Sequence, residues 1–250
     1  MIKFKEVCLY YDREPVVQGI NLTFREKAVT GILGPNGCGK STMLSAIRGL
    51  VRYSGSILLA GKEVLKYPKA QLARFLAAVP QSHQPSFPYT CLEVVLSGRN
   101  PYISYLPKKP DVEKALECLA AVNAKQLAER PYTRISGGER QLILIARALC
   151  QEPQVILFDE PTASLDFSNT YRVMSLIKGI SHAKGVTCAV TVHDPNLALL
   201  FCDEVAIFIK GALVQGSPEA LITEQTLREV YGMDAVVYRQ DGVRFVVPSF

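Results

Sequence analysis

Short apolar runs and segments with helical spacing alternate along most of the chain. The apolar runs predict strands at residues 28–33, 57–60, 155–158, 186–192 and 204–209. Apolar residues spaced by three and four predict helices at residues 41–50, 168–184 and 196–202. Strands that alternate with helices in this way are typical of an α/β fold, in which a mainly parallel sheet carries helices on both faces.

The middle of the chain has a different character. Proline is frequent between Ser82 and Pro110, around a short helical segment at residues 92–96. Residues 111–122 then have helical spacing, and Asp111 is the expected N-cap because its side chain can accept a hydrogen bond from the first turn. These features predict helices joined by irregular segments.

A further helix is expected at residues 138–149, and it must be buried because it is apolar almost all round. We therefore divide the single domain of residues 1–250 into an α/β core (1–82 and 153–250) and an inserted helical subdomain (83–152). A hairpin is predicted near the C-terminus, with strands at 235–238 and 243–247 and its turn at Asp241 and Gly242.

Composition narrows the class of protein. The 250 residues are 48% hydrophobic and 20% charged with a net charge of +5, which suits a globular protein and gives no basic patch for nucleic acid. Seven cysteines without a CxxC pair predict neither disulfides nor a zinc site. The first residues lack the apolar core of a signal peptide, and no apolar run approaches the roughly 20 residues of a membrane span. We therefore expect a cytosolic chain that is able to dock on a membrane protein.

A glycine-rich loop lies between the predicted strand at 28–33 and the helix that follows it. It consists of Gly34, Pro35, Asn36, Gly37, Cys38, Gly39, Lys40, Ser41 and Thr42, and it fits the pattern G-x-x-x-x-G-K-[ST]. Glycines let the backbone N–H groups wrap around phosphate oxygens, and the helix N-terminus favours an anion. Lys40 is expected to reach the β- and γ-phosphates and Ser41 to ligate Mg²⁺. The loop predicts that the chain binds ATP.

Two acidic residues end the apolar run at 155–158. Asp159 and Glu160 would lie at the carboxyl edge of a buried parallel strand, where α/β sheets bind ligands. Asp159 is expected to hold Mg²⁺ through its water shell, and Glu160 to act as general base on the attacking water. The pair predicts ATP hydrolysis.

Residues 135–141, Ile-Ser-Gly-Gly-Glu-Arg-Gln, lie at the start of the predicted buried helix. This segment resembles the signature motif of the ATP-binding cassette (ABC) ATPases, and the resemblance extends over essentially the whole chain. It implies a P-loop ATPase core with an N-terminal antiparallel β part, plus the helical subdomain. It also implies that the signature residues Ser136, Gly137, Gly138 and Glu139 contact nucleotide.

The same resemblance implies roles for four further residues. Tyr11 matches the aromatic on which adenine stacks, with Tyr10 as the alternative. Gln81 matches the glutamine that contacts Mg²⁺ and water, and Asp166 matches the D-loop aspartate that faces the opposite subunit. His193 matches the switch histidine, which contacts the γ-phosphate.

Three positions depart from the common pattern of the family. Pro195 follows His193 and Asp194 where Leu is more usual, and Pro suits the first turn of the next helix. Position 139 is Glu where many cassettes have Gln, and we expect function to survive because Ser136 and the glycines are intact. Cys38 stands where Ala or Ser is frequent. Two interpretations remain for it: a small side chain beside the phosphates, or an oxidation-sensitive site.

The resemblance also implies partners. Two copies of the chain would pair head-to-tail, so that each ATP lies between the phosphate loop of one and the signature of the other. Residues 94–102 and 107–111 look like the helical subdomain of importers for iron-siderophore, haem, cobalamin or molybdate. Such a subunit lies on the inner face of the cell membrane under a permease dimer. An external binding protein delivers the transported substrate to that permease. The alternative is a soluble ABC ATPase of iron–sulfur cluster assembly; a polypeptide exporter subunit is a weaker third.

Overall fold

The computed structural model describes residues 2–11, 14–81 and 87–249. The chain divides into two compact units. The first comprises Met1–Tyr67 and Ile177–Phe250, and the second comprises Pro68–Leu176. The predicted boundary between residues 82 and 83 lies outside the described residues, so the division into core and helical subdomain stays a prediction. Each unit is described by itself below.

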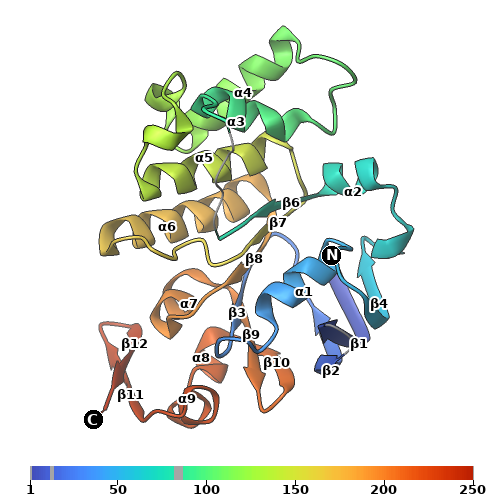
Figure 1. Cartoon of the computed structure of the whole chain (residues 1–250). Helices are drawn as coiled ribbons and strands as arrows, with labels where there is room; N and C mark the ends of the chain where they lie inside the picture. Colours follow the sequence, from blue (N-terminus) through green and yellow to red (C-terminus); the bar gives the residue numbers. More distant parts are fainter. Residues whose placement is uncertain (1, 12–13, 82–86, 250) are drawn as a thin grey trace. The chain divides into compact units, whose positions relative to one another are not determined.

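Two sheets form the framework of the first unit (Figure 1). One is antiparallel in the order β2–β1–β4–β5, from strands β1 (Ile2–Tyr11), β2 (Glu14–Thr23), β4 (Tyr53–Leu59) and β5 (Lys62–Glu63). In the other, β3 (Val29–Leu33) lies between β8 (Thr187–Thr191) and β9 (Glu204–Ile209), parallel to both, and β10 (Ala212–Gly216) pairs antiparallel with β9. The second sheet is therefore mixed.

Burial explains why these strands could be recognised from sequence. Every residue of β3 and β8 is buried, as expected for strands covered on both faces. The antiparallel β part and the mixed sheet confirm the predicted α/β class.

Helices and a hairpin complete the first unit: α1 (Lys40–Ile47), α7 (Pro195–Phe201), α8 (Pro218–Leu221), α9 (Glu224–Tyr231), and strands β11 (Ala235–Gln240) and β12 (Val243–Pro248). The hairpin is confirmed, with Asp241 and Gly242 between its strands. Helix α9 was not predicted. It starts after Thr223, whose hydroxyl accepts a hydrogen bond from Thr226 N, and it ends at Gly232 in the left-handed region.

The second unit pairs β6 (Leu76–Val79) with β7 (Val155–Phe158) in parallel and carries most of the remaining helices. These are α2 (Lys69–Phe75), α3 (Cys91–Leu96), α4 (Lys109–Ala121), α5 (Gly137–Cys150) and the first part of α6 (Phe167–Lys184), with short 3₁₀ turns at Ser97–Arg99, Lys125–Leu127 and Tyr132–Arg134. In Figure 1, α3, α4 and α5 lie side by side. The predicted burial of α5 is confirmed.

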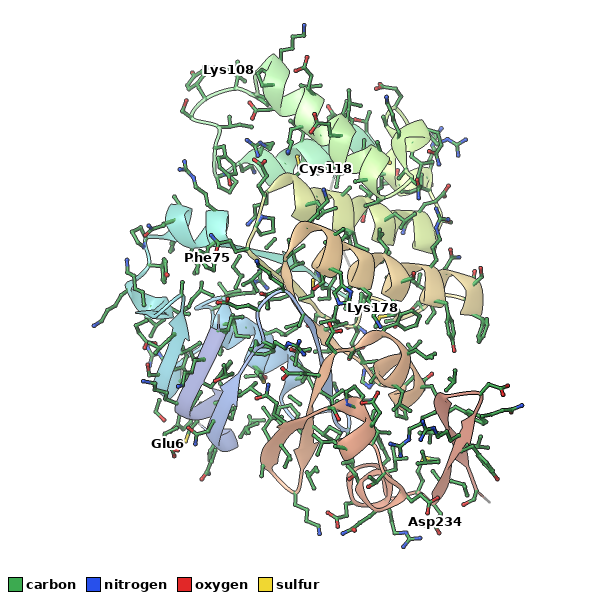
Figure 2. The ribbon with its side chains drawn as sticks, turned by 180° about the vertical axis from the view of Figure 1, so that it is seen from behind. Glu6, Phe75, Lys108, Cys118, Lys178 and Asp234 are labelled. Atoms are coloured by element: carbon green, nitrogen blue, oxygen red, sulfur yellow. The ribbon has the colours of Figure 1, made fainter. Side chains whose placement is uncertain are left out.

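One expected helix cap was wrong. Helix α4 begins after Lys108, which Figure 2 labels at the start of that helix. Asp111 therefore occupies the third helical position, from which its carboxylate accepts a hydrogen bond from Lys108 N at 3.0 Å. An acid at this position reaches back to the N-cap backbone instead of acting as the N-cap.

Two further expectations concern disulfides and membrane spans. All seven cysteines are free. Among the described residues, every helix is too short or too polar to traverse a bilayer.

Candidate nucleotide-binding and catalytic site

The glycine-rich loop joins β3 to α1 and leaves the start of α1 open to an anion. Gly39 is the N-cap residue, with φ 104°, and no side chain caps the helix there. A Cβ at position 39 would lie 2.9 Å from Val17 Cγ2, so both conformation and space require glycine. The first backbone N–H groups of α1 are thus left for phosphate oxygens.

Lys40 is held across the same loop. Its ammonium donates hydrogen bonds to Gly34 O at 2.8 Å and to Pro35 O at 3.0 Å, and the residue is only 5% exposed. A buried ammonium needs partners of this kind. The phosphates of a nucleotide would compete with these carbonyls for its three donors.

The other loop residues differ in exposure. Pro35, Asn36, Gly37 and Ser41 are exposed, and Cys38 and Thr42 are half-buried. Burial raises the pKa of the Cys38 thiol, and nearby Lys40 only partly opposes this. Because the thiolate is the reactive form, a raised pKa makes oxidation slow. This favours the interpretation of Cys38 as a small side chain beside the phosphates.

Two predicted catalytic residues contact each other at the ends of β6 and β7. Val79 and Phe158 are register partners, and Asp159 N donates to Val79 O at 2.9 Å. Directly beyond, Gln81 Nε2 donates to Glu160 Oε2 at 2.8 Å. The strand pairing thus brings residues 79 positions apart in sequence into hydrogen-bonding distance.

The backbone at Glu160 is unusual. Its φ is 45°, in the left-handed region that non-glycine residues seldom adopt. Such strain costs on the order of 1 kcal/mol or more and is concentrated at functional sites. The hydrogen bond from Gln81 orients the Glu160 carboxylate.

The signature segment forms a capping box at the start of α5. Ser136 Oγ accepts from Glu139 N at 3.3 Å, while Glu139 Oε2 accepts from Ser136 N and from Ser136 Oγ, each at 2.8 Å. The hydrogen bond from the Ser136 backbone, followed by that from its hydroxyl, lowers the pKa of Glu139. The Glu at position 139 therefore serves the local helix cap.

Asp166 is the residue that caps α6. Its two carboxylate oxygens accept from Asn169 N at 2.8 Å and from Asn169 Nδ2 at 2.7 Å. The same Asn169 amide packs on the signature helix, because a Cβ at Gly138 would lie 2.8 Å from Asn169 Cγ. Asn169 was not identified from the sequence, although it links the two motifs.

His193 and Tyr11 are the remaining predicted residues. His193 is exposed and follows β8, two positions after its last residue. The backbone of Tyr11 ends β1, but its side chain lies outside the part of the chain that the structure describes. The hydroxyl of the alternative, Tyr10, lies 3.3 Å from Ser54 Oγ. The structure therefore does not choose between the two tyrosines.

The predicted residues fall into two groups by unit. The phosphate loop, with Lys40 and Ser41, and His193 belong to the first unit. Gln81, the carboxylates at 159–160, the signature segment and Asp166 belong to the second. Within the second unit, Gln81 and Glu160 are in direct contact.

Comparison with known proteins identifies the class. Residues 17–163, more than half of the chain, match the family model described as ABC transporter. The chain belongs to the ABC transporter family, and within that family it is an ATP-binding, ATP-hydrolysing subunit.

Similar proteins indicate which group of ABC transporter subunits this chain resembles. The hemin import ATP-binding protein HmuV of Shewanella denitrificans is 37% identical over 96% of this chain and 97% of its own length. The achromobactin transport ATP-binding protein CbrD of Dickeya dadantii is 32% identical over 93% and 88%. The cobalamin import ATP-binding protein BtuD of Halobacterium salinarum is 34% identical over 86% of this chain, but over only 55% of its own length.

Solved structures agree with these relatives. An inward-facing metal-chelate type ABC transporter superposes with a TM-score of 0.88 at 30% identity, covering 100% of this chain and 97% of the other. A dimeric ATP-binding cassette in a post-hydrolysis state, bound to ADP and Pi, gives a TM-score of 0.75 at 28% identity over 87% and 99%. The chain is thus similar to the ATP-binding subunits of metal-chelate importers.

Proposed function

We propose that this chain energises the uptake of a metal chelate by binding and hydrolysing ATP beneath a separate permease. The observation that carries the proposal is the likeness, over the whole chain, to a metal-chelate type transporter together with a phosphate loop of the required geometry. The relatives named for hemin import, cobalamin import and achromobactin transport point to the same class of cargo.

The local geometry supports a proposed catalytic role for each of these residues. Lys40 and the N–H groups at the start of α1 bind the β- and γ-phosphates. Glu160 accepts a proton from the attacking water, and Gln81 holds its carboxylate through the 2.8 Å hydrogen bond. His193, which follows β8, contacts the γ-phosphate. Each role is a proposal that mutation can test.

Mg²⁺ is expected with the nucleotide, and the available donors fit it. No group of three or more His, Cys, Asp or Glu side chains that could hold a metal occurs among the described residues. Mg²⁺ keeps several waters and binds through one or two protein oxygens together with substrate phosphates. Ser41, Gln81 and Asp159 offer a hydroxyl, an amide and a carboxylate oxygen for this purpose. The ion would neutralise charge on the phosphates.

The site is proposed to be completed by a second copy of the chain. A structural relative is a dimeric cassette bound to ADP and Pi. Ser136 to Glu139 of one copy would then face the phosphate loop of the other, with Asp166 at the same junction. ATP would favour the closed pair because it contacts both copies, and its hydrolysis would release them.

The remaining partners are a permease dimer and, beyond it, an external substrate-binding protein. The chain would lie on the cytoplasmic face of the membrane against the permease. Its cargo is proposed to be haem, cobalamin or an iron-siderophore. Molybdate, also expected from the sequence, does not occur in the names of the relatives given above.

Purification from solubilised membranes tests the importer assignment. We expect the tagged chain to co-purify with a polytopic permease, and cells that lack it to lose ATP-dependent uptake of haem, cobalamin or an iron-siderophore. Uptake should return with the wild-type chain and not with Glu160→Gln. Recovery of the chain only in the soluble fraction, bound to iron–sulfur scaffold proteins, would instead support the soluble ATPase alternative.

A further inference from the structure

The loop after β8 and the C-terminal segment are joined by a tyrosine that the mechanism above does not use. Tyr231 is the last residue of α9, and its hydroxyl donates towards His193 O at 3.5 Å, the outer limit of such a bond. His193 is the residue proposed to contact the γ-phosphate. The end of α9 therefore lies against the backbone of the switch residue.

The same hydroxyl also lies close to the phosphate loop. The pKa of Tyr231 is raised to about 12, mainly by burial and further by neighbouring Cys38 and Asp194, while a hydrogen bond with the backbone of Gly34 opposes the rise. The hydroxyl thus stays protonated at physiological pH and remains able to donate a hydrogen bond. Gly34 is also the residue whose carbonyl accepts from Lys40 Nζ at 2.8 Å.

A second contact anchors the loop to the C-terminal hairpin. Asn196, in the first turn of α7, donates from Nδ2 to Val246 O at 3.1 Å and accepts at Oδ1 from Val246 N at 2.7 Å. The amide therefore pairs with the backbone of β12 through two hydrogen bonds. Asp194 caps α7 by accepting from Asn196 N at 2.8 Å. Residues 193–196 are thus tied to both α9 and β12.

A cavity lies beside this loop. Its volume is about 160 Å³, and it lies between the loop and the C-terminal segment, lined among others by His193, Asp194, Leu227, Met233 and Val246. Polar contacts beside such a space contribute to the position of the loop, because neighbouring atoms do not fill the space completely. The Tyr231 hydroxyl and the Asn196 amide are two such contacts.

We propose that Tyr231 and Asn196 are positioning residues for ATP hydrolysis. Through them, the C-terminal segment from α9 to β12 holds His193 in a fixed position relative to the phosphate loop. This rests on the proposed role of His193. In this proposal Tyr231 acts through its contact with the His193 backbone. Its loss should therefore affect kcat more than the binding of ADP, which lacks the γ-phosphate.

The test compares two tyrosine-to-phenylalanine changes in the purified transporter complex. Tyr231→Phe removes only the hydroxyl. Tyr238→Phe makes the same change on β11, where the ring stacks on Phe245 at 5.6 Å and is half exposed. We expect Tyr231→Phe to lower kcat about three- to tenfold, as the loss of one hydrogen bond allows, with ADP affinity within twofold of wild type. Tyr238→Phe should match wild type in both.

Asn196→Ala provides the second variant. It should lower kcat by a similar factor, and the double variant with Tyr231→Phe should fall by less than the product of the two factors, because both act on one loop. Thermal unfolding is measured for each variant, so that a loss of folded protein is not counted as a change in kcat.

The outcomes separate the inference from the function on which it rests. A wild-type complex without ATPase activity would overturn the proposed function itself. An active wild type with unchanged kcat in folded Tyr231→Phe and Asn196→Ala would overturn only the positioning role. Equal loss in Tyr231→Phe and Tyr238→Phe would also overturn it, because the effect would then be general to the C-terminal segment.

Discussion

Two helices of the second unit begin with nearly identical capping boxes, and only one of them carries the signature. At α5, Ser136 N and Oγ each donate to Glu139 Oε2 at 2.8 Å, and Glu139 N donates to Ser136 Oγ at 3.3 Å. At α3, the corresponding distances between Thr90 and Glu93 are 2.7, 2.9 and 3.2 Å. Removing the hydroxyl from each therefore makes a matched pair of perturbations.

Both changes should destabilise the fold to a similar extent. Replacing a Ser or Thr N-cap by Ala costs about 1 kcal/mol. For a chain of this length, that corresponds to a fall in Tm of roughly 2–4 °C. We expect Ser136→Ala and Thr90→Ala to show this shift in thermal unfolding without nucleotide.

Their effects on hydrolysis should differ. Ser136→Ala also removes a donor from the signature segment, which is proposed to contact the nucleotide bound to the opposite copy, so kcat should fall about tenfold or more, in line with the loss of one charge-assisted hydrogen bond. Thr90→Ala should hydrolyse ATP at close to the wild-type rate below its Tm. Steady-state ATPase assays at saturating ATP measure both.

The result that would refute this reasoning is a folded Ser136→Ala variant whose kcat equals that of Thr90→Ala. The signature serine would then serve only as a helix cap. Ser136→Thr keeps the cap hydroxyl and should recover most of the lost stability.

Three further predictions concern charge at the site. Lys40→Ala should abolish ATP binding in titration calorimetry, whereas the exposed Lys62→Ala should bind normally; retained affinity in the former would contradict the phosphate-loop assignment. Glu160→Gln keeps the acceptor for Gln81 but removes the proposed base, so it should bind ATP, lose turnover and accumulate as a closed dimer in size-exclusion chromatography; normal turnover would exclude Glu160 as the base. The pKa of Glu139 lies below its ordinary 4.5, so the stability it contributes is present above that pH and is lost as the pH falls through the lowered value. The Tm difference between wild type and Glu139→Gln should therefore be constant above about pH 5 and shrink in more acidic buffer; a difference that does not change with pH would remove the carboxylate from the cap.

Elements buried on both sides were the easiest to predict. Strands β7 and β9 match the expected ranges 155–158 and 204–209, because an unbroken apolar run bounded by polar residues leaves few alternatives. The phosphate loop was equally clear, since its spacing is set by the geometry of an anion held by backbone N–H groups. Here local sequence determines local structure.

Elements whose stability depends on distant contacts were not predictable in the same way. Helix α9 buries only Leu227 and Val230, too few apolar residues for a helical period to be visible. For α4, Asp is suited both to the N-cap and to the third helical position, so the sequence alone does not distinguish the two. The hydrogen bond from Lys108 N places Asp111 at the third position. Tyr231 is 38 residues from His193, so no local pattern could connect them.

The contact between Asn169 and Gly138 limits how the sequence of this protein can vary. Any side chain at position 138 must displace the Asn169 amide, and that amide donates the 2.7 Å hydrogen bond to Asp166. A change in the signature glycine is therefore also a change in the D-loop cap. In mutational libraries or homologue design, positions 138, 166 and 169 should be varied together, because a substitution at one is tolerated only when the other two accommodate it.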